Sequence, residues 1–306
     1  MRISTSMLFG TGTQGLQDLQ SDLFKLQNQM STGRRILTPS DDPIGAWEAQ
    51  QVSQSQSINN QYISNQDTAV SRLSYMEANL TNLEDGLARI YELAATGKGK
   101  GDAQRAALVP ELEELLQNVL TLANAKDGTG NYIYSGTMSS TKPFTASGSG
   151  IAYAGDQGQQ QLRVSSSNVM EMGHNGFDVF MQVKDAQGNQ TGSSIFETVQ
   201  NLIDIFDPTS GVPFDETTRA QLQDQLSVSI DHVANRIASV GTRLNTLDDL
   251  KVASKDFDLQ YATRLQDLQE VDYTAAISQF SQLQFQLQAA QLTFKQSSQM
   301  SLFSIL

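Results

Sequence analysis

The chain has 306 residues, a formal net charge of −13 at pH 7 and no cysteine. This length is sufficient for about two domains with a sizeable core, and the acidic charge argues against nucleic acid or an anionic membrane as a partner. The absence of cysteine excludes disulfides, thiolate metal sites and a cysteine nucleophile. No segment is long and apolar enough to span a membrane, and the first residues lack the apolar region of a cleaved signal peptide. We therefore expect no membrane insertion and, if the protein is exported, a route that does not read a cleaved signal.

The first predicted helix carries a leucine stripe with the alternating spacing of a coiled-coil seam. An isolated helix with so few heptads is marginal in water. The stripe must therefore pack against another part of the chain or against other subunits. It consists of Leu16, Leu19, Leu23, Leu26, Met30, Gly33 and Leu37.

The segment STGRRILTPSDDP, residues 31–43, follows this stripe and is dense in Gly, Pro, Ser and Asp. Such a composition predicts that the helix stops here and that the chain turns. Asp41 or Asp42 is expected to cap the next helix, because a carboxylate at that position accepts from free backbone N–H groups. Pro43 suits the first turn of that helix.

Two more helices are predicted before the pattern changes. The apolar residues from Leu73 to Ala94 keep the coiled-coil alternation, until the glycines of residues 97–101 end the helix. A shorter helix follows, with an apolar face from Leu108 to Leu122. We interpret these central stripes as the core of a helical bundle.

Between residues 131 and 194 the helical period disappears. Short segments with aromatic or β-branched residues alternate with Gly, Ser and Asn, which predicts a small β-rich module. These segments are YIYSGT (132–137), PFTA (143–146), IAYAG (151–155), QLRVS (161–165), NVMEM (168–172) and DVFMQV (178–183).

The helical period resumes at Ile195, pauses at residues 207–215 and then continues in a stripe from Leu226 to Leu247. A stripe of this length predicts one long helix. We expect the stripe to continue through Leu259, Leu265 and Leu268 into a C-terminal stripe of Ala276, Phe280, Leu283, Leu287, Ala290 and Phe294.

These elements predict a mainly α fold with a β-rich insert, in which an elongated multilayer helical coiled coil or bundle is built from both ends of the chain. The predicted terminal coiled-coil helices are residues 1–40 and 268–306. Residues 41–130 and 195–267 form the predicted helical bundle domain, and residues 131–194 form a small β-rich domain, which the family resemblance described below implies is the outer domain.

Gly10, Gly12 and Gly15 spell the GxGxxG pattern of dinucleotide-binding loops. That loop needs a buried strand before it and a βαβ unit around it. Here a helix, a Pro/Asp turn and another helix follow instead. We therefore interpret these glycines as a flexible N-terminal lead-in and expect no cofactor.

His174 and His232 are the only histidines, and neither has an acidic or histidine partner at metal-ligand spacing. His232 is expected at the surface of its helix. His174 could serve as a base near the serines 165–167, so an enzyme with its site in the β-rich module is one alternative. Residues 185–192 lack the spacing of a calcium loop and predict a hairpin turn. Because nothing converges, we expect no catalytic residue and no metal site.

The two terminal stripes favour an interaction role, because no short connection joins either of them to a neighbouring helix. Burial of one leucine side chain contributes about 1.5–3 kcal/mol, so several exposed leucines would make a monomer sticky. The predicted assembly and coiled-coil interface consists of Leu16, Leu19, Leu23, Leu26, Met30, Phe280, Leu283, Leu287 and Phe294.

Seven segments spread along the chain have distinctive sequences. They are MRISTSML (1–8), the turn at 31–43, NYIYSGTMSSTKPF (131–144), YAGDQGQ (153–159), MGHNGFDVF (172–180), QEVDYTAAI (269–277) and LTFKQSSQMSLFSIL (292–306). Together they resemble the flagellin family of bacterial flagella, at both ends of the chain and in its middle. The MRIST start, the YIYSGT segment and the SLF ending are more similar to the branch of that family that joins the hook to the filament than to flagellin itself.

The resemblance implies a structural axial protein, not an enzyme, that joins the hook through the preceding hook-associated protein to the flagellin filament. The alternative is a flagellin. The resemblance also implies type III export, an extracellular location at the hook-filament junction and a homo-oligomeric ring. The implied partners are other copies of the chain, the preceding hook-associated protein, flagellin and an export chaperone. We expect the turn at residues 31–43 to set the angle between radial layers. Its predicted interlayer residues are Gly33, Arg34, Arg35, Ser40, Asp41, Asp42 and Pro43.

Overall fold

The computed structural model describes residues 5–147, 150–185 and 187–303. The described part of the chain is mainly helical with two small sheets, which confirms the predicted fold class. The extreme ends of the first and last segments that resemble flagellins, residues 1–4 and 304–306, lie outside the described residues.

The chain divides into two compact units. Residues 1–59 and 256–306 form the terminal unit, and residues 60–255 form the central unit. Helices α2 (Pro43–Thr96) and α6 (Glu216–Gln269) supply residues to both units. The three-domain division made from the sequence draws its boundaries elsewhere and stays a prediction.

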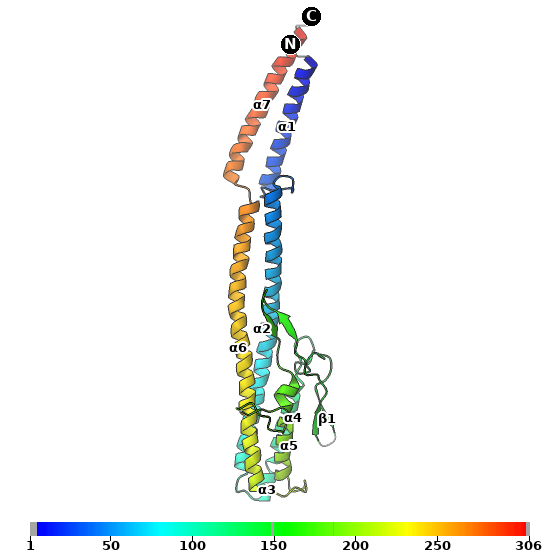
Figure 1. Cartoon of the computed structure of the whole chain (residues 1–306), viewed down its shortest axis with the longest axis vertical. Coiled ribbons are helices and arrows are strands. Elements are labelled where there is room, and N and C mark those ends of the chain that lie inside the picture. The colour runs from blue at the N-terminus through cyan, green and yellow to red at the C-terminus, as the bar shows by residue number, and fades with distance from the viewer. Residues whose placement is uncertain (1–4, 148–149, 186, 304–306) are drawn as a thin grey trace. The chain divides into compact units, whose positions relative to one another are not determined.

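In the terminal unit, α1 (Thr5–Thr32) and α7 (Tyr273–Phe303) pack side by side (Figure 1). Helix α1 ends where Gly33 adopts a φ of +70°, a conformation that only glycine adopts readily. The prediction that the first stripe continues through Gly33 and Leu37 is therefore wrong, because both residues follow the end of the helix.

A break separates α6 from α7, where the sequence predicted one continuous stripe. The Asp272 carboxylate caps α7 by accepting from the N–H of Thr274 at 2.9 Å. Leu259 is 67% exposed, so the expectation that it belongs to the stripe is wrong. The helix instead turns Asp258 toward α2, where its carboxylate accepts from the Gln56 amide at 2.9 Å.

The central unit is built on the predicted stripe of α2, whose side chains from Leu73 to Ala94 are buried. The buried face of α6 packs on the same core, as its stripe from Leu226 to Leu247 predicted. The short helices of this unit are α3 (Asp102–Ala106), α4 (Val109–Ala123) and α5 (Ile195–Phe206). The Ser194 hydroxyl caps α5 by accepting from the N–H of Glu197 at 3.0 Å.

The β-rich insert contains two separate antiparallel hairpins. Strand β1 (Phe144–Ser147) pairs with β2 (Gly150–Tyr153), and β3 (Gln161–Arg163) pairs with β4 (Val169–Glu171). A single π-helical turn, η1 (Phe177–Met181), follows them. A two-stranded hairpin is marginal alone, so the insert depends on packing against the helices.

Two of the six predicted β segments are not strands. Residues 132–137 form turns, and residues 178–183 contain the π-helical turn. The Asn175 side chain caps that turn by accepting from the N–H of Asp178 at 2.8 Å. This local capping competes with extended structure, so the aromatic and β-branched residues of this segment misled the prediction.

The insert is held by a cluster of aromatic rings rather than by its short strands. Phe180 packs against Phe144, Phe196 and Tyr134, with ring centroids 5.2, 5.6 and 5.1 Å away. Tyr153 extends the cluster at 5.2 Å from Phe144. Because Phe196 belongs to α5, the cluster fixes the insert to the helical part of the central unit.

Candidate functional site

The seam between α1 and α7 contains a small buried core. Leu26, Val271 and Ala276 are the buried residues of this core, which therefore joins both ends of the chain. Three predicted seam residues, Met30, Phe280 and Leu283, pack against it.

The other predicted seam residues are less covered within one subunit. Leu16, Leu19, Leu23, Leu287 and Phe294 are all only half-buried. Each of them retains apolar surface that a neighbouring molecule could remove from water.

The GxGxxG glycines lie within α1, so the prediction of a flexible lead-in is wrong. At Gly12, a Cβ atom would lie 2.8 Å from the ring of Phe294, so the missing side chain lets this ring approach the helix. Phe294 also meets Phe9 edge to face, with ring centroids 5.7 Å apart. Gly12 therefore serves helix packing, and the three glycines lie in a helix rather than in the strand-to-helix loop of a dinucleotide site.

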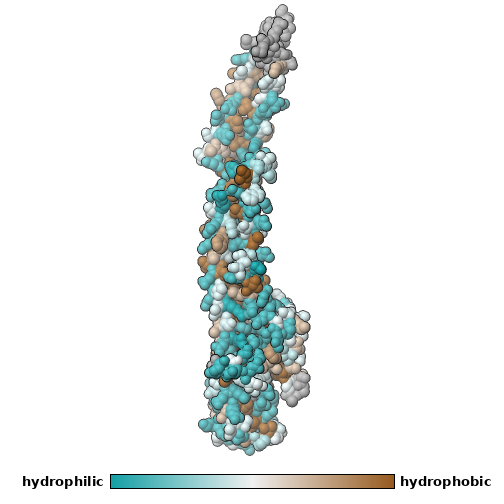
Figure 2. Space-filling view, viewed as in Figure 1, coloured by the Kyte–Doolittle hydropathy of each residue, from teal (hydrophilic) through white to brown (hydrophobic). Residues whose placement is uncertain are grey.

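Large apolar side chains outside the seam are also exposed in the terminal unit. Phe24 on α1 is 64% exposed, Phe285 on α7 is 72% exposed, and Trp47 at the start of α2 is 64% exposed. Figure 2 shows hydrophobic side chains in brown among the hydrophilic ones on the face it draws. These exposed residues are not among the predicted interface residues. Phe24 and Phe285 fall out of phase with the stripes, and this offset is the sequence signal that marks them.

The turn at residues 31–43 and the connection between α6 and α7 are bonded to each other. The Arg35 N–H donates to the carbonyl of Gln269 at 2.7 Å, and the Val271 N–H donates to the carbonyl of Gly33 at 3.0 Å. The Arg35 guanidinium also donates to the carbonyl of Leu268 at 2.9 Å. Arg34 forms an isolated antiparallel bridge with Glu270. We call this set of contacts the connector clamp.

Two carboxylates organise the end of the turn. The Asp41 carboxylate accepts from the N–H of Thr38 at 2.9 Å and pairs with the Lys25 ammonium at 2.7 Å. These contacts, led by Lys25, lower the pKa of Asp41 to about 2. The Ser40 hydroxyl hydrogen-bonds that of Thr38 at 2.8 Å.

Asp42, one of the two capping residues that the sequence predicted, caps α2. Its carboxylate accepts from the N–H of Gly45 at 2.9 Å and pairs with Arg35 at 3.2 Å. Pro43 occupies the first helical position. The backbone bond to Gly45, followed by Arg35, lowers the pKa of Asp42. The carboxylate of Asp42 therefore links the start of α2 to the connector clamp.

An open groove of about 430 Å³ lies between this turn, α2 and α6. Its walls combine apolar residues, among them Ile36, Leu37 and Leu265, with polar ones, among them Thr38 and Gln50. The predicted turn residues therefore border a groove of mixed polar and apolar character.

Substitution Gly33→Ala tests whether the connector clamp depends on the left-handed backbone. We expect the free energy of unfolding of the terminal unit to fall by about 1–2 kcal/mol, because a Cβ penalises this conformation. Urea unfolding followed by the fluorescence of Trp47, the only tryptophan, measures it. The control is Gly15→Ala, a helical position with open space around the new Cβ, where we expect an increase of up to about 1 kcal/mol. An unchanged Gly33→Ala variant would contradict the expectation.

The histidines are placed differently from the prediction. His232 is 3% exposed, so the expectation of a surface residue is wrong. The ring of His174 has no hydrogen-bond partner in the described part of the chain. The Ser165 hydroxyl instead accepts from the N–H of Asn168 at 3.0 Å. Among the described residues, neither a serine nor a carboxylate bonds the His174 ring.

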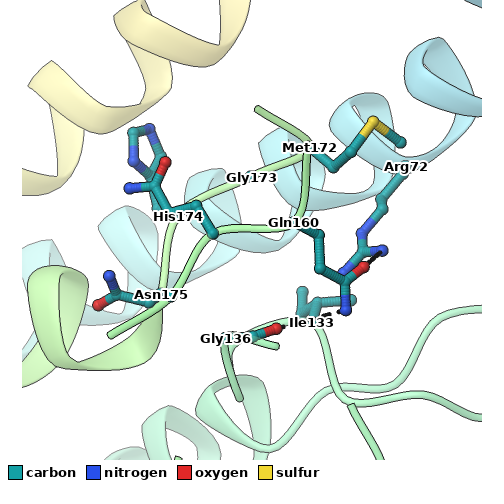
Figure 3. Close-up of a pocket in the computed structure, with 10 residues that line it drawn as sticks. Arg72, Ile133, Gly136, Gln160, Met172, Gly173, His174 and Asn175 are labelled. Atoms are coloured by element: carbon teal, nitrogen blue, oxygen red, sulfur yellow. Dashed lines mark hydrogen bonds between the residues drawn. The ribbon is translucent and has the colours of Figure 1, made fainter. Parts of the chain in front are cut away.

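A small cavity of about 10 Å³, the size of one water molecule, lies beside Arg72 and Gln160 (Figure 3). Figure 3 shows the His174 imidazole pointing away from these two side chains. Among the described residues, no group of three or more His, Cys, Asp or Glu side chains could hold a metal ion. A search of the same residues found no helix long and apolar enough to cross a membrane.

Comparison with known proteins agrees with the resemblance drawn from the sequence. Residues 3–139 match the family model of the bacterial flagellin N-terminal helical region. Flagellar hook-associated protein 3 of Escherichia coli K12 and that of Salmonella typhimurium LT2 are each 31% identical over 317 residues, covering 100% of this chain and 99% of theirs. The crystal structure of the flagellar junction protein of Legionella pneumophila covers 73% of this chain and 100% of its own, with a TM-score of 0.60 and 19% identity. The chain therefore belongs to the family of flagellar hook-associated protein 3.

Proposed function

We propose that the chain is a structural axial protein of the bacterial flagellum that joins the hook, through the preceding hook-associated protein, to the flagellin filament. The observation that carries this proposal is the incomplete burial of the terminal unit. Phe24, Trp47 and Phe285 are exposed, and most seam residues are only half-buried. Exposed apolar surface of this kind is typical of a protein–protein interface.

The comparisons favour the junction over the filament. The relatives that span the full chain are hook-associated proteins, and a protein with the same fold is a junction protein. A flagellin, the alternative raised by the sequence, is therefore not favoured. In this proposal the chain has no catalytic activity and takes no cofactor.

The proposed partners are other copies of the chain in a ring, the preceding hook-associated protein and flagellin. An export chaperone would hold the chain before secretion through the flagellar type III apparatus, without cleavage of a signal. The assembled protein would be extracellular. The half-buried seam and the exposed aromatic residues would form the contacts between subunits, and the turn at residues 31–43 would set the angle between radial layers of the assembly.

Deletion of the gene tests the junction role. We expect electron microscopy to show bare hooks and a protein gel to show unassembled flagellin in the culture medium. Restoration of the gene on a plasmid should restore the filaments. Bare hooks without secreted flagellin would instead identify the chain as the filament protein, and normal flagella in the deletion strain would overturn the proposal.

A further inference from the structure

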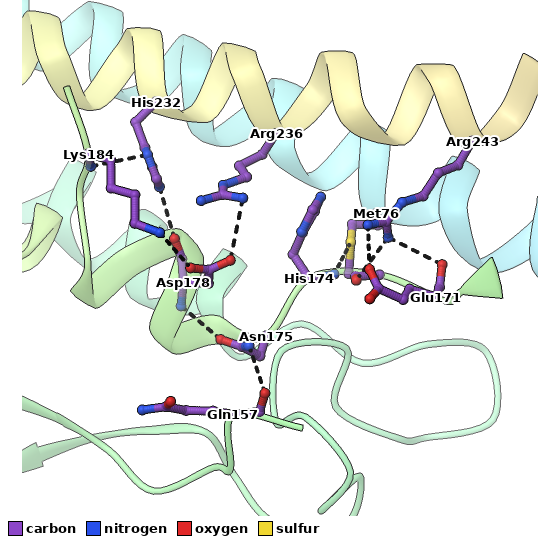
Figure 4. Close-up of polar contacts among 11 residues, drawn as sticks. Met76, Gln157, Glu171, His174, Asn175, Asp178, Lys184, His232, Arg236 and Arg243 are labelled. Atoms are coloured by element: carbon purple, nitrogen blue, oxygen red, sulfur yellow. Dashed lines mark hydrogen bonds and ion pairs between the residues drawn. The ribbon is translucent and has the colours of Figure 1, made fainter. Parts of the chain in front are cut away.

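Both histidines of the chain are buried at one place, where the β-rich insert meets α6 (Figure 4). His232 lies on α6, and His174 lies in the segment between β4 and η1. Their exposed fractions are 3% and 5%. An imidazole normally changes its charge at mildly acidic pH. Two imidazoles buried at one contact therefore make that contact sensitive to pH.

The hydrogen bonds of His232 require a neutral ring. Nδ1 accepts from the backbone N–H of Lys184 at 3.3 Å, and Nε2 lies 2.9 Å from the carbonyl oxygen of Asp178. A carbonyl only accepts, so Nε2 carries the proton and Nδ1 carries the lone pair. A second proton on Nδ1 would face the N–H of Lys184, and this contact between α6 and the insert would be lost.

The ring of His174 has no such partners. Figure 4 shows it directed toward α6 in the region of Arg236 and Arg243. Neither ring nitrogen has a hydrogen-bond partner among the described residues. The contribution of α2 here is the uncharged thioether of Met76, which accepts from the backbone N–H of His174 at 3.3 Å.

The charges around the two rings are already paired. The Arg243 guanidinium pairs with Glu171 at 2.7 Å. The carboxylate of Asp178 pairs with Arg236 at 3.4 Å and with Lys184 at 3.7 Å. Three cations thus share two carboxylates, and no unpaired anion remains among these groups to receive a protonated imidazole.

We infer that His174 and His232 form an acid-sensitive latch, which holds residues 171–184 against α6 while both rings are neutral and releases them when the rings take up protons. We call the two histidines with Asp178, Lys184 and Arg236 the histidine latch.

The direction of the pH effect follows from the pKa of each ring. Burial, followed by Arg243 and Arg236, lowers the pKa of His174 from 6.5 to about 4. Burial also lowers the pKa of His232. The open form therefore binds more protons than the closed form between these values. Above about pH 6.5 the neutral rings contribute their full stabilisation to the closed form. As the pH decreases toward 4, this stabilisation is lost, and the equilibrium constant for opening rises by up to about tenfold per pH unit for each histidine.

Nuclear magnetic resonance of the full-length wild-type chain gives the first test. Because the chain has two histidines, the imidazole C–H signals can be assigned with one substitution. We expect both rings to remain neutral at pH 6 and to titrate clearly below the ordinary value. Titration of both rings near 6.5 without loss of structure would overturn the proposal, whatever the variants do.

Hydrogen exchange, corrected for the intrinsic rate at each pH, locates the opening. Between pH 7 and pH 4.5 we expect peptides from residues 171–184 to lose at least tenfold protection, while peptides from α2 within residues 73–94 keep theirs. The double variant His174→Met with His232→Asn should abolish this loss, because neither new side chain titrates. His174→Met alone should remove part of it.

Asp207→Asn is the matched control, because it removes an acid-titrating group that caps the end of α5 and makes none of the contacts of the latch. We expect this variant to open in acid like the wild type. Equal loss of protection in the wild type and the double variant would overturn the proposal, as would loss spread evenly over the central unit.

Discussion

Replacing Leu287 with Asp is expected to stop the chain from entering the flagellum while the central unit stays folded. Leu287 lies on α7 and is half-buried in the terminal unit. A carboxylate at this position would have to lose water whenever the seam packs, and a buried charge without a partner is strongly unfavourable. The central unit does not contain residue 287, so its unfolding transition should not change.

The control for Leu287→Asp is a variant that carries the same charge outside the seam. Gln286 is exposed on the same helix, so Gln286→Asp adds an identical charge one residue earlier. We expect cells with Gln286→Asp to swim and cells with Leu287→Asp to carry bare hooks, with both proteins secreted at equal levels. Normal filaments with Leu287→Asp would show that this part of the seam is not an assembly contact.

The long helices could be predicted from the sequence, because a seam in a helical pair repeats locally. The stripe of α2 from Leu73 to Ala94 is buried as predicted, and Asp42 and Pro43 start that helix as their chemistry requires. Each of these features depends on neighbours within a few residues. Local spacing and capping rules therefore suffice for them.

The connector clamp could not be predicted, because its partners are far apart in the sequence. Arg35 and Leu268 are separated by 233 positions, and the bond between them uses a backbone carbonyl that carries no sequence signal. His232 was misplaced for a similar reason. Its partners are backbone groups of the insert, and a helical wheel of α6 cannot show which part of the chain covers that face.

Predictions made from residue spacing were wrong where a local turn or capping signal competed with the hydrophobic repeat. Gly33 continues the spacing of the first stripe, yet its backbone ends the helix, so spacing alone overstated the length of the seam. In the insert, the hydrogen bond from Asp178 to the Asn175 side chain favoured a helical turn over the strand that the aromatic and β-branched residues of this segment predicted. Turn and cap chemistry therefore decides such positions before hydrophobic period does.

Replacing Phe180 with Ala is expected to lower the free energy of unfolding of the central unit by about 3–5 kcal/mol. Phe180 has no exposed surface and touches the rings of Phe144, Phe196 and Tyr134, so its removal leaves a cavity that rigid neighbours cannot fill. Urea unfolding followed by circular dichroism measures the change. Met138→Ala, at a position 51% exposed, should stay within about 0.5 kcal/mol of the wild type.

A loss below about 1 kcal/mol with Phe180→Ala would mean that the aromatic cluster is not closed in solution, because complete burial of an aromatic side chain contributes more than that. The variant also separates stability from assembly. Phe180 belongs to the central unit and the seam belongs to the terminal unit, so a secreted and folded Phe180→Ala protein should still join the hook. If it fails to assemble while its terminal helices still pair, contacts made by the insert contribute to the junction, and the terminal seam alone does not account for assembly.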